Sequence, residues 1–217
     1  MGTAIRRSVR QGRDHRRYWD RPQRGELTYL ALGDSAAVGV GVGDPRRGYV
    51  GVLADRLAKD TGRTVRTVNL AVSGATAATL LRDQIPQLAD VPNPDFVTCV
   101  IGGNDVAWEW WRRSHTFADP LRRIARRLPA GSVLGTVPSF GHWPYEGWAR
   151  RANGVIHEEA YSNGHLVADL YTPTRRLWPW RYRHILAGDL FHPNAAGHTL
   201  WADAIWPLLS PHQAATH

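Results

Sequence analysis

The residues of this chain that could do chemistry include a serine, an aspartate and a histidine that lie far apart in the sequence. Ser35 ends the stretch Leu-Thr-Tyr-Leu-Ala-Leu-Gly-Asp-Ser at residues 27–35. A serine hydroxyl is a weak nucleophile by itself, and it needs a base, a group that orients the base, and donors for an oxyanion. His192 could act as the base, and Asp189, three residues earlier, could hold its imidazole in one tautomer. These residue types favour acyl transfer through Ser35.

Two further motifs could supply the oxyanion donors. Gly74 follows a predicted strand in the stretch at residues 69–76, and Asn104 follows another in Gly-Gly-Asn-Asp. Glycine at position 74 would let the backbone approach a substrate closely. Each residue alone could be a turn or capping residue, but together they favour an oxyanion hole. Its donors would be the backbone N–H groups of Ser35 and Gly74 and the side-chain amide of Asn104.

Apolar runs alternate with helical patterns along the chain, and this alternation predicts the elements that must position these residues. We expect strands at residues 27–32, 64–70, 95–101, 132–137 and 166–170, and helices at 49–59, 75–88, 117–128, 145–161 and 194–209. Such alternation is typical of an α/β fold, with a parallel sheet and helices on both faces. Ligands in these folds lie beyond the carboxyl ends of the strands, where the candidate motifs fall.

The ordered motifs resemble those of the SGNH hydrolase superfamily, also called the GDSL-type esterase/lipase family. Its four sequence blocks are matched here by Ser35, Gly74, Asn104 and His192, and its Asp-x-x-His element by Asp189 and His192. The resemblance extends over roughly residues 27–209. It implies a flavodoxin-like three-layer α/β/α sandwich around a five-stranded parallel sheet.

The resemblance also implies hydrolysis of esters or thioesters of lipids, sugars and small acyl compounds, without a metal or an organic cofactor. The substrate would be a small-molecule or lipid ester. One departure concerns Ala36, which stands where the family often has leucine after the serine. That position takes no part in the chemistry, so it bears on substrate fit. His198 is interpreted as a core histidine, and we predict no metal site.

Tryptophan is unusually frequent, with 10 residues in the chain, and several lie in loops near the predicted active edge. One interpretation is packing of a lid and the core. The other is an apolar or sugar-stacking substrate pocket, for which the candidates are Trp108, Trp110 and Trp143.

The net charge of +8 is concentrated at the amino terminus, where residues 1–25 hold eight arginines and two aspartates. This composition predicts a disordered basic arm at residues 1–25, a catalytic domain at 26–210 and a short carboxyl-terminal tail at 211–217. The arm could make a weak contact with an anionic surface. We expect no obligate nucleic-acid or membrane partner.

The chain shows no apolar run of the roughly 20 residues that span a membrane, and no hydrophobic segment follows its basic start. It has one cysteine, Cys99, so no internal disulfide can form. A cytoplasmic location is therefore expected.

Two alternatives to hydrolysis remain open. The same site could transfer the acyl group to another alcohol, or the fold could serve a non-catalytic protein whose basic arm binds nucleic acid or a membrane.

Overall fold

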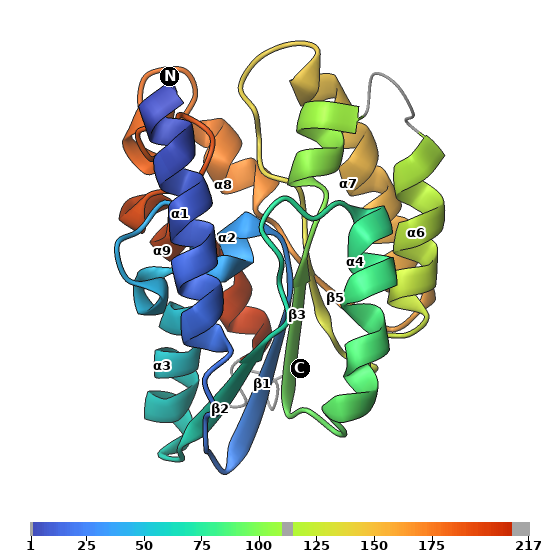
Figure 1. The fold of residues 1–217 in the computed structure, drawn as a ribbon. Helices are drawn as coiled ribbons and strands as arrows, with labels where there is room; N and C mark the ends of the chain where they lie inside the picture. Colours follow the sequence, from blue (N-terminus) through green and yellow to red (C-terminus); the bar gives the residue numbers. More distant parts are fainter. Residues whose placement is uncertain (1, 110–114, 210–217) are drawn as a thin grey trace.

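The structure is a computed structural model, and it describes residues 2–109 and 115–209 (Figure 1). Within these residues, parallel strands form a five-stranded sheet in the order β2-β1-β3-β4-β5. This order is the doubly wound one, and it confirms the predicted α/β fold with a five-stranded parallel sheet. The strands are β1 (Leu27–Gly33), β2 (Val65–Asn69), β3 (Phe96–Val100), β4 (Val133–Gly135) and β5 (Leu166–Ala168).

Helices cover both faces of the sheet, as the three-layer prediction requires. Figure 1 shows α4, α6 and α7 on one side of the strands and α1, α3 and α9 on the other. The described helices are α1 (Gly2–Trp19), α2 (Ser35–Val38), α3 (Tyr49–Thr61), α4 (Ala77–Asp83), α6 (His115–Ala125), α7 (Tyr145–Ser162), α8 (Tyr171–Arg176) and α9 (Ala195–Leu209). Short 3₁₀ or π turns lie at η1 (Pro45–Arg47), η2 (Ile85–Asp90), η3 (Asp105–Glu109) and η4 (Tyr182–Ile185).

Alternate residues of β1 enter two separate cores, because successive side chains of a strand point to opposite faces. Leu30 and Leu32 pack with residues of α4, α6 and α7. Tyr29 and Ala31 pack with residues of α3 and α9. β1 is thus buried on both faces, which explains why its sequence is a nearly continuous apolar run.

The predicted helix at 75–88 is divided in two. α4 ends at Asp83, and the chain continues as the 3₁₀ turn η2. Pro86 lies near the start of that turn, where it has no N–H to donate and disfavours helical geometry in the residue before it. The break places Gln84, which is fully buried, against the end of β1.

The prediction of a disordered arm at residues 1–25 is wrong for residues 2–19, which form α1. One face of this helix is buried on the domain. The side chain of Trp19 is buried there, and its indole N–H donates to the carbonyl of Val38 at 3.0 Å. Most of the arginines are exposed and lower the mean hydropathy of the segment, so composition alone did not reveal the buried face.

Arg16 anchors the same helix to the end of β2. Its guanidinium donates to the carbonyl oxygens of Asn69 and Ala71, at 2.6 and 3.0 Å. α1 therefore packs on the domain predicted for residues 26–210. The predicted tail at residues 211–217 lies outside the described residues. None of the described helices is long and apolar enough to cross a membrane.

Candidate active site

The turn that carries Ser35 is fixed from two directions. Gln84 forms two hydrogen bonds with Gly33, accepting from its N–H at 3.0 Å and donating to its carbonyl at 2.8 Å. A Cβ atom at Gly33 would lie 2.5 Å from the carbonyl oxygen of Val100, so only glycine fits between the strands there. Asp34 then caps α2 by accepting from the N–H of Ala36 at 3.0 Å. As a result, Ser35 lies at the first residue of α2, directly beyond the carboxyl end of β1.

The structure brings Ser35, His192 and Asp189 together, although Ser35 and His192 are 157 residues apart in sequence. Nε2 of His192 lies 2.9 Å from Oγ of Ser35. Nδ1 of His192 lies 2.6 Å from Oδ2 of Asp189. In this arrangement the imidazole can donate from Nδ1 to the carboxylate and accept the serine proton at Nε2.

The turn from Asp189 to His192 holds its own carboxylate in place. Oδ1 of Asp189 accepts from the N–H groups of Phe191 and His192, at 3.1 and 3.0 Å. Leu190 between them has a φ of 58°, in the left-handed region that a β-carbon disfavours. The strain is offset by the contacts that this tight turn makes possible.

Burial opposes ionisation of the Asp189 carboxyl, whose side chain is 6% exposed. Hydrogen bonds from His192, from the Ser8 hydroxyl and from the backbone outweigh that cost. They lower the pKa of Asp189 well below its ordinary value. The group is therefore an anion at neutral pH, and it can stabilise a positive charge on the imidazole.

Gly74 and Asn104 lie on two neighbouring loops that are tied to each other. One N–H of the Asn104 amide donates to the carbonyl of Ala75 at 2.9 Å, next to Gly74. The carboxylate of Asp105 accepts from the N–H of Ala77, with both oxygens at 3.1 Å. Gly74 has a φ of 85°, and an added Cβ would meet no atom within 4 Å, so its backbone faces open space.

Comparison with known proteins shows the family. The family described as GDSL-like lipase/acylhydrolase matches residues 31–200, which is most of the chain. The chain belongs to the GDSL-like lipase/acylhydrolase family. This is the SGNH hydrolase group of carboxylic ester hydrolases that the sequence motifs resemble.

A curated relative is the GDSL-like esterase Rv1075c of Mycobacterium tuberculosis, 25% identical over 206 residues. The match covers 87% of this chain but only 63% of the relative, so this chain spans less than two thirds of that protein's length. Among solved structures, TesA is 24% identical with a TM-score of 0.70, covering 85% of this chain and 99% of that one. The acetylxylan esterase Axe2 of Geobacillus stearothermophilus is 24% identical with a TM-score of 0.65, covering 85% and 94%. These two likenesses support the fold.

In this member of the GDSL-like family, an aromatic wall leads away from the histidine. The ring of Phe191 lies 5.1 Å from that of His192, and the ring of Trp108 lies 5.9 Å from that of Phe191. Phe140 packs on Phe191 from another side, with 6.4 Å between the ring centroids. Of the predicted pocket residues, Trp108 is thus connected to the site and is 64% exposed, whereas Trp143 is 86% exposed. Trp110 lies outside the described residues.

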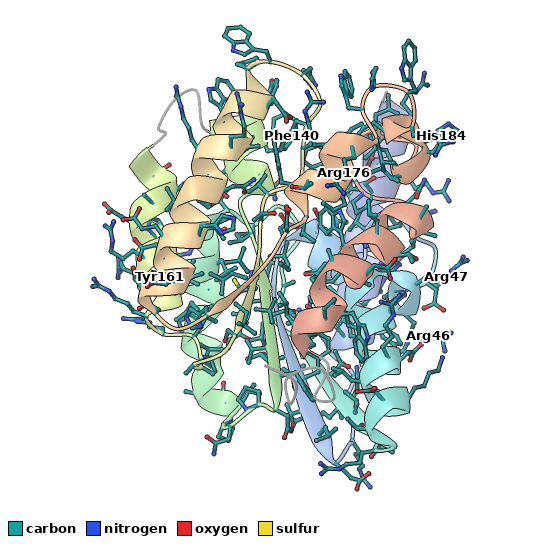
Figure 2. All side chains as sticks on the ribbon, turned by 180° about the vertical axis from the view of Figure 1, so that it is seen from behind. Arg46, Arg47, Phe140, Tyr161, Arg176 and His184 are labelled. Atoms are coloured by element: carbon teal, nitrogen blue, oxygen red, sulfur yellow. The ribbon has the colours of Figure 1, made fainter. Side chains whose placement is uncertain are left out.

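Glu146 anchors the loop that carries Phe140. Its Oε2 accepts from the N–H groups of Phe140 and Gly141, at 3.1 and 3.0 Å, and from the Ser139 hydroxyl at 2.9 Å. Figure 2 labels Phe140 in this region of the molecule. Sequence reasoning missed both Phe140 and Glu146. Phe140 closely follows a predicted strand and Glu146 lies at the start of a predicted helix, but their contact depends on how the loop between them folds back.

His198 takes no part in the candidate site. It is fully buried, and burial lowers its pKa to about 4. Its Nδ1 accepts from the N–H of Tyr49 at 3.2 Å, and its Nε2 lies 3.1 Å from the carbonyl of Val40. Within the described ranges, there is no group of three or more His, Cys, Asp or Glu side chains that could hold a metal ion.

Asp34 gives a pH-dependent prediction. Burial raises its pKa from 3.8 to about 6, and the hydrogen bond from Ala36 and the nearby His192 only partly oppose this. A raised carboxyl pKa means that the folded state resists ionisation. The stability that this group contributes is thus complete below about pH 4 and is lost as pH rises through 6. An asparagine at position 34 cannot ionise, so the Asp34→Asn variant should not lose this stability. The difference between its free energy of unfolding and that of wild type should therefore rise by about 2–3 kcal/mol between pH 4 and pH 7.

Urea unfolding of both proteins at pH 4, 5, 6 and 7 measures this difference. The exposed Asp55→Asn on α3 is the matched control, for which we expect a nearly constant difference from wild type. An Asp34→Asn curve that runs parallel to wild type across this range would show that ionisation of Asp34 has no cost in the fold.

Proposed function

We propose that this chain is a serine ester hydrolase that works through an acyl-enzyme on Ser35. The observation that carries the proposal is the continuous contact from the Ser35 hydroxyl through His192 to Asp189, at 2.9 and 2.6 Å. Nucleophile, base and orienting carboxylate are thus already within hydrogen-bond distance. The match to the family supports the same reaction class.

In the first half of the reaction, Oγ of Ser35 attacks the carbonyl carbon of the ester and its proton moves to Nε2 of His192. The carbonyl oxygen becomes an oxyanion. The N–H groups of Ser35 and Gly74 and the Asn104 amide are the proposed donors to it. Asp189 stabilises the imidazolium that has formed. When the carbon–oxygen bond to the alcohol breaks, the leaving oxygen takes the proton from His192.

In the second half, water attacks the acyl carbon and gives a proton to Nε2 of His192. Collapse of the second tetrahedral intermediate releases the acid, and the proton returns to Oγ of Ser35. The balance of the cycle is one ester and one water converted to one acid and one alcohol. If another alcohol replaces water in this half, the same steps transfer the acyl group to that alcohol.

The aromatic wall supports a substrate with an apolar group next to the ester. Phe191 contacts the ring of His192, so a substrate held against this wall lies beside the reacting atoms. Trp108 extends the same surface outward and is largely exposed. We propose carboxylic esters as substrates, with thioesters and acetylated sugars within the same chemistry. Trp143 remains a proposed pocket residue.

The outer face of α1 carries exposed arginines, including Arg6, Arg7, Arg10 and Arg13. A weak, salt-sensitive contact between this face and an anionic surface remains a proposal. It needs no loose arm, because α1 is docked on the domain and still presents these side chains to solvent. A cytoplasmic location likewise stays a prediction.

Covalent trapping tests the proposed nucleophile. A fluorophosphonate should label the wild-type protein once, and peptide mass spectrometry should place the label on Ser35, since the reagent reacts with a serine activated by a nearby base. Labelling should be lost in Ser35→Ala and kept in Ser73→Ala, which removes the serine beside Gly74. A label on Ser73, or undiminished labelling of Ser35→Ala, would overturn the assignment. A panel of esters and acceptor alcohols, assayed alongside, separates hydrolysis from transfer.

A further inference from the structure

The helix α1 lies outside the residues that match the family, 31–200, yet it reaches the candidate active site. Figure 1 shows α1 lying along the domain, on the same side of the sheet as α3 and α9. Its hydroxyl-bearing residue Ser8 donates a hydrogen bond to Oδ2 of Asp189, across 181 residues of sequence. This is the same carboxylate oxygen that accepts from Nδ1 of His192.

The contact completes the surroundings of the Asp189 carboxylate. Oδ1 accepts from the backbone N–H groups of Phe191 and His192. Oδ2 accepts from His192 and from Ser8. The backbone donors fix one oxygen, but a carboxylate held on one side can still tilt about its bond to the β-carbon. A donor on Oδ2 from a different element restrains that tilt.

The rest of α1 also holds the loop against which the histidine turn packs. The Gln11 side chain donates to the carbonyl of Val42 at 3.0 Å and accepts from the N–H of Gly41 at 3.3 Å. A Cβ atom at Gly41 would lie 2.0 Å from the carbonyl oxygen of Pro193 and 3.4 Å from Cβ of His192. The backbone of this loop is therefore in direct contact with the turn that carries His192, and α1 supports it.

We propose that Ser8 is a positioning residue for the reaction, acting on His192 through Asp189. This inference rests on the proposed function of Ser35, His192 and Asp189. Ser8 gives up no proton in the cycle and touches no substrate. Its hydroxyl holds Oδ2 in the plane that Nδ1 of His192 requires, and it shares the negative charge with the imidazole.

Loss of the hydroxyl should therefore alter the chemical step and its pH dependence together. We expect Ser8→Ala to lower kcat for a short ester by about five- to twentyfold, with KM changed less than about twofold. Without the Ser8 hydroxyl, the Asp189 carboxylate would interact more strongly with the imidazole of His192 and would stabilise its protonated form. The acid limb of the pH profile of kcat/KM should consequently move to higher pH, by up to about half a unit.

Ser8→Thr keeps the hydroxyl and should restore most of kcat and the wild-type acid limb. Val9→Ala is the matched control on the same helix, since Val9 is 51% exposed, and it should behave as wild type. Thermal unfolding of all variants shows whether α1 remains docked.

A Ser8→Ala protein with wild-type kcat and an unmoved acid limb would overturn the inference, as would failure of a stably folded Ser8→Thr to recover activity. The parent proposal is tested separately by Ser35→Ala. If Ser35→Ala is inactive while Ser8→Ala behaves as wild type, only the role of Ser8 is wrong. If Ser35→Ala keeps full activity, the proposed function itself is wrong.

Discussion

Replacing Ser35 with alanine should lower kcat/KM for a short chromogenic ester by about 10⁴- to 10⁶-fold. The Ser35 oxygen forms the bond to the acyl carbon, and alanine leaves nothing that can form it. His192 would remain, but it would have only water to activate. The residual rate would come from the oxyanion donors and from binding, which act without the nucleophile. Steady-state kinetics with purified wild type and variant measure the change.

The exposed Ser162→Ala, at the end of α7, is the matched control and should retain wild-type activity. Because Ser35 is buried and alanine is smaller, the variant should also fold, and urea unfolding verifies this. A folded Ser35→Ala that hydrolyses the ester within tenfold of wild type would exclude an acyl-enzyme at this position.

Much of the site could be predicted because its chemistry is encoded locally. Asp189 and His192 are separated by one tight turn, so their contact needed no knowledge of the fold. Ser35, Gly74 and Asn104 each follow an apolar run, and parallel strands bring such positions to one edge. β1 and β3 were recognisable because a strand buried on both faces requires nearly unbroken apolar sequence.

Other parts of the site depend on contacts that no local pattern encodes. Ser8 meets Asp189 only because α1 docks across the domain, and its segment has the composition of a solvated arm. The helix is stabilised by a few specific contacts, such as the indole of Trp19 on Val38, which hydropathy averages do not detect. Glu146 was similarly missed, because its role is to bind backbone N–H groups of a loop whose path is set by tertiary packing.

Asp189→Asn should reduce kcat by about 10³- to 10⁴-fold, less than the loss in Ser35→Ala. The amide has the shape of the carboxylate, so the turn can keep its hydrogen bonds from the backbone. An Asn NH₂ directed at Nδ1 of His192 would, however, make that nitrogen an acceptor. The proton would then sit on Nε2, which faces Oγ of Ser35 at 2.9 Å, and the imidazole could not accept the serine proton. The anion that stabilises the imidazolium would also be lost.

Stopped-flow or steady-state assays, together with the rate of fluorophosphonate labelling, measure this effect, since both depend on the same base. Asp203→Asn is the matched control, because Asp203 is an exposed aspartate of α9 that pairs with Arg56 at 2.6 Å. It should leave both rates unchanged. Wild-type labelling in Asp189→Asn would show that His192 does not depend on the carboxylate.

The same variant decides how Ser8 acts. If the Ser8 hydroxyl works only through the carboxylate, its removal should cost little once position 189 is asparagine, because the tautomer of His192 is already wrong. The double variant Ser8→Ala/Asp189→Asn should then match Asp189→Asn within about twofold, a strongly non-additive result. Independent losses that multiply would instead mean that α1 acts on the site by another route, such as the contact of Gln11 with the loop at Gly41 and Val42. Non-additivity is thus the expected signature of a continuous hydrogen-bonded chain from α1 to the nucleophile.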